Sequence, residues 1–140
     1  MSKILMPVDG SDNANRVVGF LIKQLTNTKE PIEIHLLNVQ HSFPGTIKGV
    51  ADQAKQRHHD EGAKALAGAC KLLDDAKLEY TYHISVGEVG EVIAHFVKDL
   101  NIDQVVMGCT GSGAVVNVLM GSTATKVLGL VSVPVMLVRP

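Results

Sequence analysis

The sequence has few cysteines and no long apolar run, and both absences narrow what the protein can be. Its two cysteines, Cys70 and Cys109, form no CxxC pair. A disulfide framework is therefore not expected, and a reducing compartment fits. No apolar run approaches the ~20 residues of a membrane-spanning helix, and residues 1–6 lack the apolar length and cleavage site of a signal peptide. We expect a soluble, cytoplasmic protein without a membrane partner.

The chain also lacks a charge surplus of either sign. Thirteen Lys and Arg residues stand against 14 Asp and Glu residues, giving a formal net charge of −1. The composition therefore gives no basic surplus that would indicate a nucleic-acid partner. With 140 residues, 46% of them apolar, the chain can bury an ordinary core, and its length predicts a single domain over residues 1–140.

Strand and helix patterns alternate along the chain. Apolar runs predict strands at 4–8, 32–39, 105–107 and 133–138, and the alternation of Tyr80, Tyr82, Ile84 and Val86 predicts a half-exposed edge strand. Helical spacing of apolar residues predicts helices from Ser11 or Asp12 to about 25, then over about 50–76, 89–100 and 121–130. Five strands alternating with four helices indicate an α/β, doubly wound parallel sheet with helices on both faces.

In such sheets, ligands bind beyond the carboxyl ends of the strands, where the strand order reverses. Asp9-Gly10-Ser11 follows the first strand, and a glycine-rich segment follows the fourth. If these two strands are neighbours, both segments face one crevice.

The glycine-rich segment has the form G-x2-G-x9-G-S, with glycines at Gly108, Gly111 and Gly121. It contains neither the GK[ST] of a Walker loop nor a complete GxGxxG fingerprint. Glycines let backbone N–H groups approach a ligand, and Gly121-Ser122-Thr123 stands at a helix start, where N–H groups and the helix dipole favour an anion. The alternative is that the glycines only form turns and that Ser122 only caps the helix.

Together these segments resemble the universal stress protein (UspA-like) family, in the branch that binds ATP. The resemblance covers the whole chain: residues 7–11, Leu37-Asn38-Val39, Gly87, residues 103–108, the complete glycine motif and residues 133–138. It implies the adenine-nucleotide alpha hydrolase-like fold, a Rossmann-like five-stranded sheet in the order 3-2-1-4-5.

The resemblance also implies a nucleotide site. Asp9, in the segment Pro7-Val8-Asp9, would bond the ribose or an adenine edge, and Pro7, Val39 and Met107 would pack around the adenine. Ribose and phosphates would be held by Gly108, Gly111, Gly121, Ser122 and Thr123. Residues 108–125 contain no Lys or Arg, and Lys126 is the nearest cation. Backbone N–H groups, the helix dipole and Mg²⁺ would therefore meet the phosphate charge.

Other candidate residues have ordinary explanations. Asp9 could be a catalytic base, but no His or second carboxylate is tied to it by local spacing. The six histidines suggest a metal, yet no HExxH or CxxC accompanies them, so we expect no metal site and place most of them on the surface. Cys109 would lie beside the phosphates, where its thiol pKa could fall, but an inert small residue is the favoured interpretation.

The last strand predicts an oligomer. Pro134 cannot donate a ladder hydrogen bond, so the strand should lie at a sheet edge. Met136 and Val138 would lie on one face of this strand, and Val133, Val135 and Leu137 on the other. An apolar edge is a liability unless it is covered. We expect two copies to pair through residues 133–138 as a homodimer, which the resemblance also implies.

The predicted function is an ATP-binding regulatory protein of the stress response, with nucleotide occupancy as its signal. We do not expect the protein to be an enzyme, because phosphoryl transfer needs a positioned base and strong cationic stabilisation, and the sequence shows neither. Slow ATP hydrolysis is the alternative. A nucleotidyl transferase or pyrophosphatase should show HIGH or SGGxDS motifs, which are absent. A partner-binding module should have broken glycines, and flavin binding has only the fold class in its favour.

Overall fold

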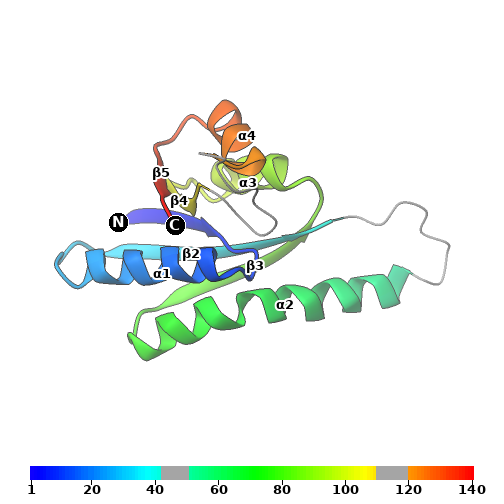
Figure 1. Cartoon of the computed structure of the whole chain (residues 1–140), viewed down its shortest axis with the longest axis horizontal. Helices are drawn as coiled ribbons and strands as arrows, with labels where there is room; N and C mark the ends of the chain where they lie inside the picture. Colours follow the sequence, from blue (N-terminus) through cyan, green and yellow to red (C-terminus); the bar gives the residue numbers. More distant parts are fainter. Residues whose placement is uncertain (42–50, 110–119) are drawn as a thin grey trace.

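The computed structural model describes residues 1–41, 51–109 and 120–140, without the side chains of 51–54. Five parallel strands form one sheet in the order β3-β2-β1-β4-β5 (Figure 1). They are β1 (Ser2–Pro7), β2 (Ile32–Gln40), β3 (Tyr80–Val86), β4 (Gln104–Gly108) and β5 (Val135–Val138). The predicted strand order and sheet type are confirmed.

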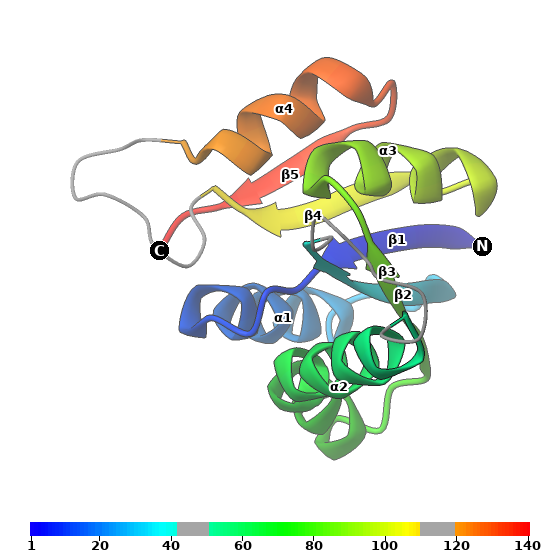
Figure 2. The ribbon, with the colours of Figure 1, turned by 90° about the vertical axis from the view of Figure 1, so that its right-hand side faces the viewer.

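Within the described residues, four helices connect the strands and cover both faces of the sheet. They are α1 (Asp12–Leu25), α2 (Ala51–Asp75), α3 (Val89–Asp99) and α4 (Ser122–Leu130). Figure 2 shows α1 and α2 on one face and α3 and α4 on the other. Within the described ranges, no helix is long and apolar enough to cross a membrane.

The central strand β1 supplies side chains to two separate core layers. Ile4, Met6 and Val8 pack in the layer beneath α1 and α2, whereas Leu5 packs in the layer beneath α3 and α4. This division follows from the strand geometry, since successive side chains point to opposite faces. Burial on both faces explains why β1 is an apolar run rather than an alternating one.

Helix α1 begins at a turn that only a few residue types can form. Gly10 adopts φ +86°, a left-handed conformation that glycine tolerates best. Ser11 is the N-cap, and its Oγ accepts a hydrogen bond from the Ala14 N–H at 3.1 Å. A side chain at position 10 would also approach the Cα of Ala65 on α2 to 3.2 Å. The turn therefore brings the start of α1 close to α2.

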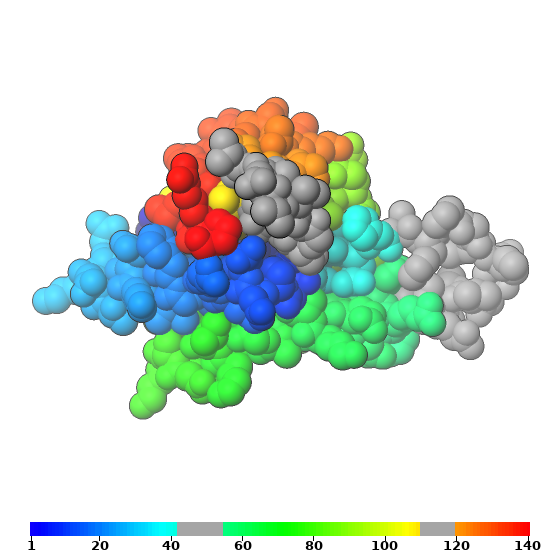
Figure 3. Space-filling view, in the orientation of Figure 1, coloured from blue at the N-terminus to red at the C-terminus, as the bar shows by residue number. Residues whose placement is uncertain are grey.

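Both edge strands match their predicted character. β3 is half-exposed at one edge. β5 lies at the other edge, where Val135 and Leu137 join the α3 and α4 layer, Val138 joins the opposite layer, and Met136 is 39% exposed. The end of β5 lies on the same side of the molecule as the turn into α1 (Figure 3).

Candidate nucleotide site

The strand order reverses between β1 and β4. β1 is followed in sequence by β2, which pairs on one side of it, while β4 pairs on the other side with Leu5 opposite Val105. The two neighbouring strands end at Pro7 and Gly108. The segments that the sequence singled out after these strands therefore open on the same edge of the sheet, as expected for a ligand crevice.

The turn after β1 presents a carboxylate at this edge. Val8 is buried, and its N–H donates to the Leu37 carbonyl at 2.8 Å, extending the ladder one residue beyond β1. Asp9 is exposed, and its Oδ1 accepts a hydrogen bond from the Ser11 N–H at 2.9 Å. This is the local pattern of an Asx turn. It holds the Asp9 side chain at the edge of the sheet where β1 ends.

Two residues at the end of β2 support that turn, and the site interpretation of the sequence missed them. Asn38 is only 3% exposed, and its Nδ2 donates to the Val8 carbonyl at 2.8 Å. Its Oδ1 accepts a hydrogen bond from Gln40 Nε2 at 2.6 Å. The available signal was an amide inside an apolar strand, because a buried polar side chain normally has a partner.

The end of β4 packs into the core. Met107 is buried in the layer beneath α3 and α4, which the half-buried Val39 of β2 also contacts. Gly108 pairs with Val138. Cys109 is buried, and its thiol donates to the Val138 carbonyl at 3.6 Å. Burial and this partner match the expected small, structural cysteine.

A hydrogen bond joins the two ends of the glycine motif. The Gly121 N–H donates to the Cys109 carbonyl, so the start of α4 lies against the end of β4. Gly121 is the N-cap and, as a glycine, has no side chain with which to cap the helix. Ser122 is exposed and Thr123 half-buried in the first turn. Gly111 lies outside the described residues.

Lys126, the cation nearest the motif in sequence, is engaged by acidic residues of α3. Its Nζ lies 3.0 Å from Glu88 Oε2 and 3.9 Å from Glu91 Oε1. Hydrogen bonding to Glu88 raises the pKa of Lys126. The Glu88 carboxylate also caps α3. The pKa of Glu88 is lowered, most by the hydrogen bond from the Glu91 N–H and next by the one from Lys126. The positive charge of Lys126 is thus paired within the protein.

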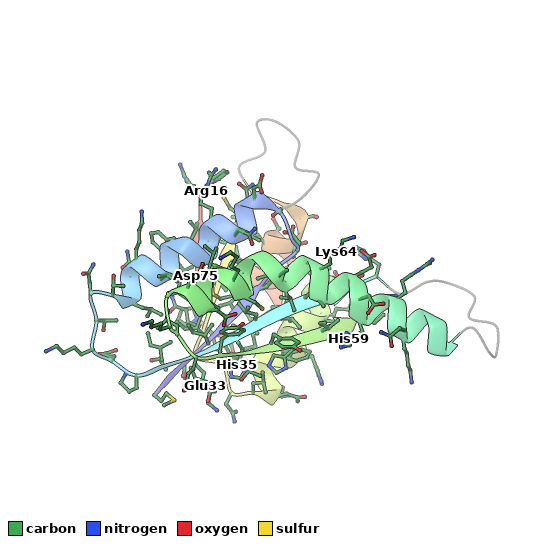
Figure 4. All side chains as sticks on the ribbon, turned by 90° about the horizontal axis from the view of Figure 1, so that it is seen from below. Arg16, Glu33, His35, His59, Lys64 and Asp75 are labelled. Atoms are coloured by element: carbon green, nitrogen blue, oxygen red, sulfur yellow. The ribbon has the colours of Figure 1, made fainter. Side chains whose placement is uncertain are left out.

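Most histidines were expected at the surface, and His35 is the buried exception. His35, in β2, is 7% exposed. Its Nε2 lies 2.8 Å from Glu33 Oε2, and its Nδ1 lies 3.0 Å from Nε2 of His83 on β3; Figure 4 shows Glu33 and His35 side by side. Burial, then the neighbouring charge of His35, lowers the pKa of His83. The described ranges contain no group of three or more potential metal-binding side chains.

The structure therefore gathers most predicted site residues at one edge of the sheet. Around the ends of β1, β2 and β4 lie Pro7, Val8, Asp9, Val39, Met107 and Gly108. The bond between Gly121 and Cys109 adds the first turn of α4 to this group. A carboxylate, apolar side chains and a helix N-terminus thus lie at the same edge of the sheet.

A model of the universal stress protein family matches residues 1–139. The chain belongs to this family. A universal stress protein of Synechocystis is 25% identical over 139 residues, which are 99% of this chain and 43% of the relative. One from Methanocaldococcus jannaschii is 25% identical over 138 residues, covering 98% of this chain and 81% of the relative. The chain thus spans less than half the length of the Synechocystis protein.

Solved structures of the family superpose on the whole sheet. UspA from Lactobacillus plantarum gives a TM-score of 0.82 at 22% identity, covering 99% of this chain and 97% of UspA. An Arabidopsis thaliana family member with AMP bound gives 0.73 at 19% identity, with coverages of 99% and 92%. An Archaeoglobus fulgidus member in complex with dAMP gives 0.65 at 20% identity, with coverages of 98% and 96%. This likeness confirms the adenine-nucleotide alpha hydrolase-like fold.

Proposed function

We propose that this universal stress protein binds ATP, with Mg²⁺, in the crevice beyond the ends of β1 and β4. The contact between the Gly121 N–H and the Cys109 carbonyl carries the proposal. It brings the N-terminus of α4 to the end of β4, next to the strand whose turn presents Asp9. Amide donors at a helix start suit phosphates, and a carboxylate suits hydroxyl or amino donors.

Each element of the crevice takes one part of the nucleotide. Asp9, presented by Pro7 and Val8, bonds the ribose or an adenine edge, and Val39 and Met107 join Pro7 around the base. The ribose and phosphates are held by Gly108, Gly111, Gly121, Ser122 and Thr123. Relatives of the same fold carry AMP and dAMP, which supports an adenine nucleotide as the ligand.

Binding rather than turnover is the proposed activity, with nucleotide occupancy as a regulatory signal in the cytoplasm. Phosphoryl transfer relies on cations placed on the transferred group. Residues 108–125 contain no Lys or Arg, and Glu88 and Glu91 engage Lys126. A site of backbone donors and Mg²⁺ therefore suits retention of the nucleotide better than its cleavage. The alternatives are a slow ATPase and a protein-binding module without nucleotide.

Pairing of two copies through residues 133–138 is proposed as well, with residues 1–140 acting as a single domain. β5 is an edge strand with Met136 39% exposed on it, and pairing would cover this edge. Met136→Lys should shift the mass measured by light scattering from dimer to monomer. A monomeric wild-type protein at micromolar concentration would contradict the pairing.

The first test is calorimetric titration of Mg²⁺-ATP into nucleotide-stripped protein. We expect saturable binding of one ATP per chain. Asp9→Ala should weaken binding about tenfold or more, the usual effect of losing a hydrogen bond to a charged group. Gly121→Val should weaken it by crowding the phosphate site. The control is Asp75→Ala, at the exposed end of α2. Absence of heat and of thermal stabilisation at millimolar ATP would refute nucleotide binding.

A further inference from the structure

The side chains at the end of β2 form a hydrogen-bonded chain that runs toward Asp9. Gln40 Nε2 donates to Asn38 Oδ1 at 2.6 Å, and Asn38 Nδ2 donates to the Val8 carbonyl at 2.8 Å. Val8 is joined directly to Asp9. The Gln40 carbonyl also accepts the Gly87 N–H at 2.9 Å, so the same residue contacts the turn between β3 and α3. We call Gln40 and Asn38 the β2 strap.

The strap replaces the backbone ladder at the point where β1 turns. The last paired residues of β1 and β2 are Pro7 and Leu37. One residue later, the Val8 carbonyl is met by a side-chain amide instead of a backbone N–H. The chain can therefore leave the sheet at Asp9 without a buried carbonyl losing its partner, which would be costly.

The Val8 carbonyl requires the NH₂ end of the Asn38 amide, and Gln40 donates to the opposite end. An amide can rotate to exchange its oxygen and its NH₂ group. The rotated form would place Asn38 Oδ1 against the Val8 carbonyl, where two acceptors repel. The donor from Gln40 occupies Oδ1 and reinforces the orientation that the Val8 carbonyl requires. Gln40 is half-buried at the strand end and Asn38 is almost fully buried, so the strap is also shielded from competition by water.

We propose that the β2 strap positions the Asp9 carboxylate for the nucleotide, with Gln40 and Asn38 as positioning residues that do not touch the ligand. This inference rests on the proposed function for its ligand. Its structural half, that Gln40 fixes the turn from Val8 to Asp9, can be measured without any ligand.

The test uses Gln40→Leu, because it removes the donor while its half-buried position limits damage to the core. The matched control is Gln104→Leu, also a half-buried strand residue but at the start of β4, away from the crevice. In nucleotide-free protein, amide hydrogen exchange should become about tenfold faster at Val8 in Gln40→Leu, because local opening of the turn becomes easier. Exchange at Leu5 should not change. The control should match the wild type at both positions.

A double-mutant cycle with Mg²⁺-ATP completes the test. Gln40→Leu should weaken binding about tenfold alone, the size of one lost hydrogen bond, and should cause no further loss in an Asp9→Ala background. Equal losses in both backgrounds would show that Gln40 does not act through Asp9 and would overturn the positioning role. Unchanged exchange at Val8 would overturn the strap itself. Faster exchange in a protein that binds no ATP would support the strap and refute the proposed function.

Discussion

Gly10 and Gly19 should respond in opposite directions to the same substitution by alanine. Gly10 has φ +86°, and a Cβ there would lie 3.2 Å from Ala65 Cα, a backbone atom of α2. Gly19 lies inside α1, and a Cβ there would meet no atom within 4 Å. The first site therefore combines conformational strain with crowding, while the second offers only the helix propensity of alanine.

The expected sizes follow from these two environments. Holding a non-glycine residue at a left-handed φ costs about 1–2 kcal/mol, and crowding against α2 adds to that cost, so Gly10→Ala should lower the free energy of unfolding by roughly 2 kcal/mol. Gly19→Ala should raise it by about 0.8–1 kcal/mol. For a chain of this length, the Tm shifts should be about −7 °C and about +3 °C.

Urea unfolding followed by circular dichroism suits the comparison, because the chain has no tryptophan to report by fluorescence. Both variants should unfold with the wild-type m-value, which shows that a change in midpoint is a change in stability. A Gly10→Ala protein within about 0.5 kcal/mol of the wild type, the ordinary range for surface substitutions, would refute the claim that the turn before α1 requires glycine.

Three further predictions concern packing, pH and thiol chemistry. Gly62→Ala should destabilise the protein despite its position in α2, because a Cβ would lie 2.5 Å from the Ile84 side chain; equilibrium unfolding that shows a gain in stability would contradict this. Burial lowers the pKa of His83 from its ordinary value of 6.5, so the folded state favours the neutral imidazole. The stability that neutral His83 contributes to the folded protein is complete above about pH 6.5 and is lost as the pH falls through the lowered pKa. His83→Gln should therefore flatten the decline in Tm between about pH 7 and pH 5. In native protein, iodoacetamide should modify the half-buried Cys70 faster than the buried Cys109, and mass spectrometry of peptides sampled over time checks the order.

The sequence predicted the sheet well because strand burial leaves a pattern in the residues themselves. Alternation in residues 80–86 indicated a half-exposed edge, and β3 lies at an edge. Pro134 indicated the other edge, and β5 lies there. The ends of β1 and β4 could be expected at the same edge of the sheet because parallel strands place their carboxyl ends together.

Contacts between distant residues could not be predicted in this way. The bond from Asn38 to the Val8 carbonyl depends on the register of β1 against β2, which no local pattern specifies. The same limit applied to His35, since its partners Glu33 and His83 become visible only when β2 and β3 are aligned. Lys126 could be identified as the nearest cation, but not as the partner of Glu88.

The central position of β1 has a consequence for how the protein is made. β1 is synthesised before the other four strands of the sheet, yet one of its two neighbours is β4, residues Gln104–Gly108. Asp103 stabilises that pairing through two hydrogen bonds to Lys3, 100 residues earlier in the sequence. The Asp103 carboxylate accepts from the Lys3 N–H, and the Asp103 N–H donates to the Lys3 carbonyl, both at 2.8 Å. Loop closure must therefore precede the completion of the core, which slows folding. During synthesis, one edge of β1 stays unpaired until β4 has emerged, and in that interval it is the edge that a chaperone would have to protect.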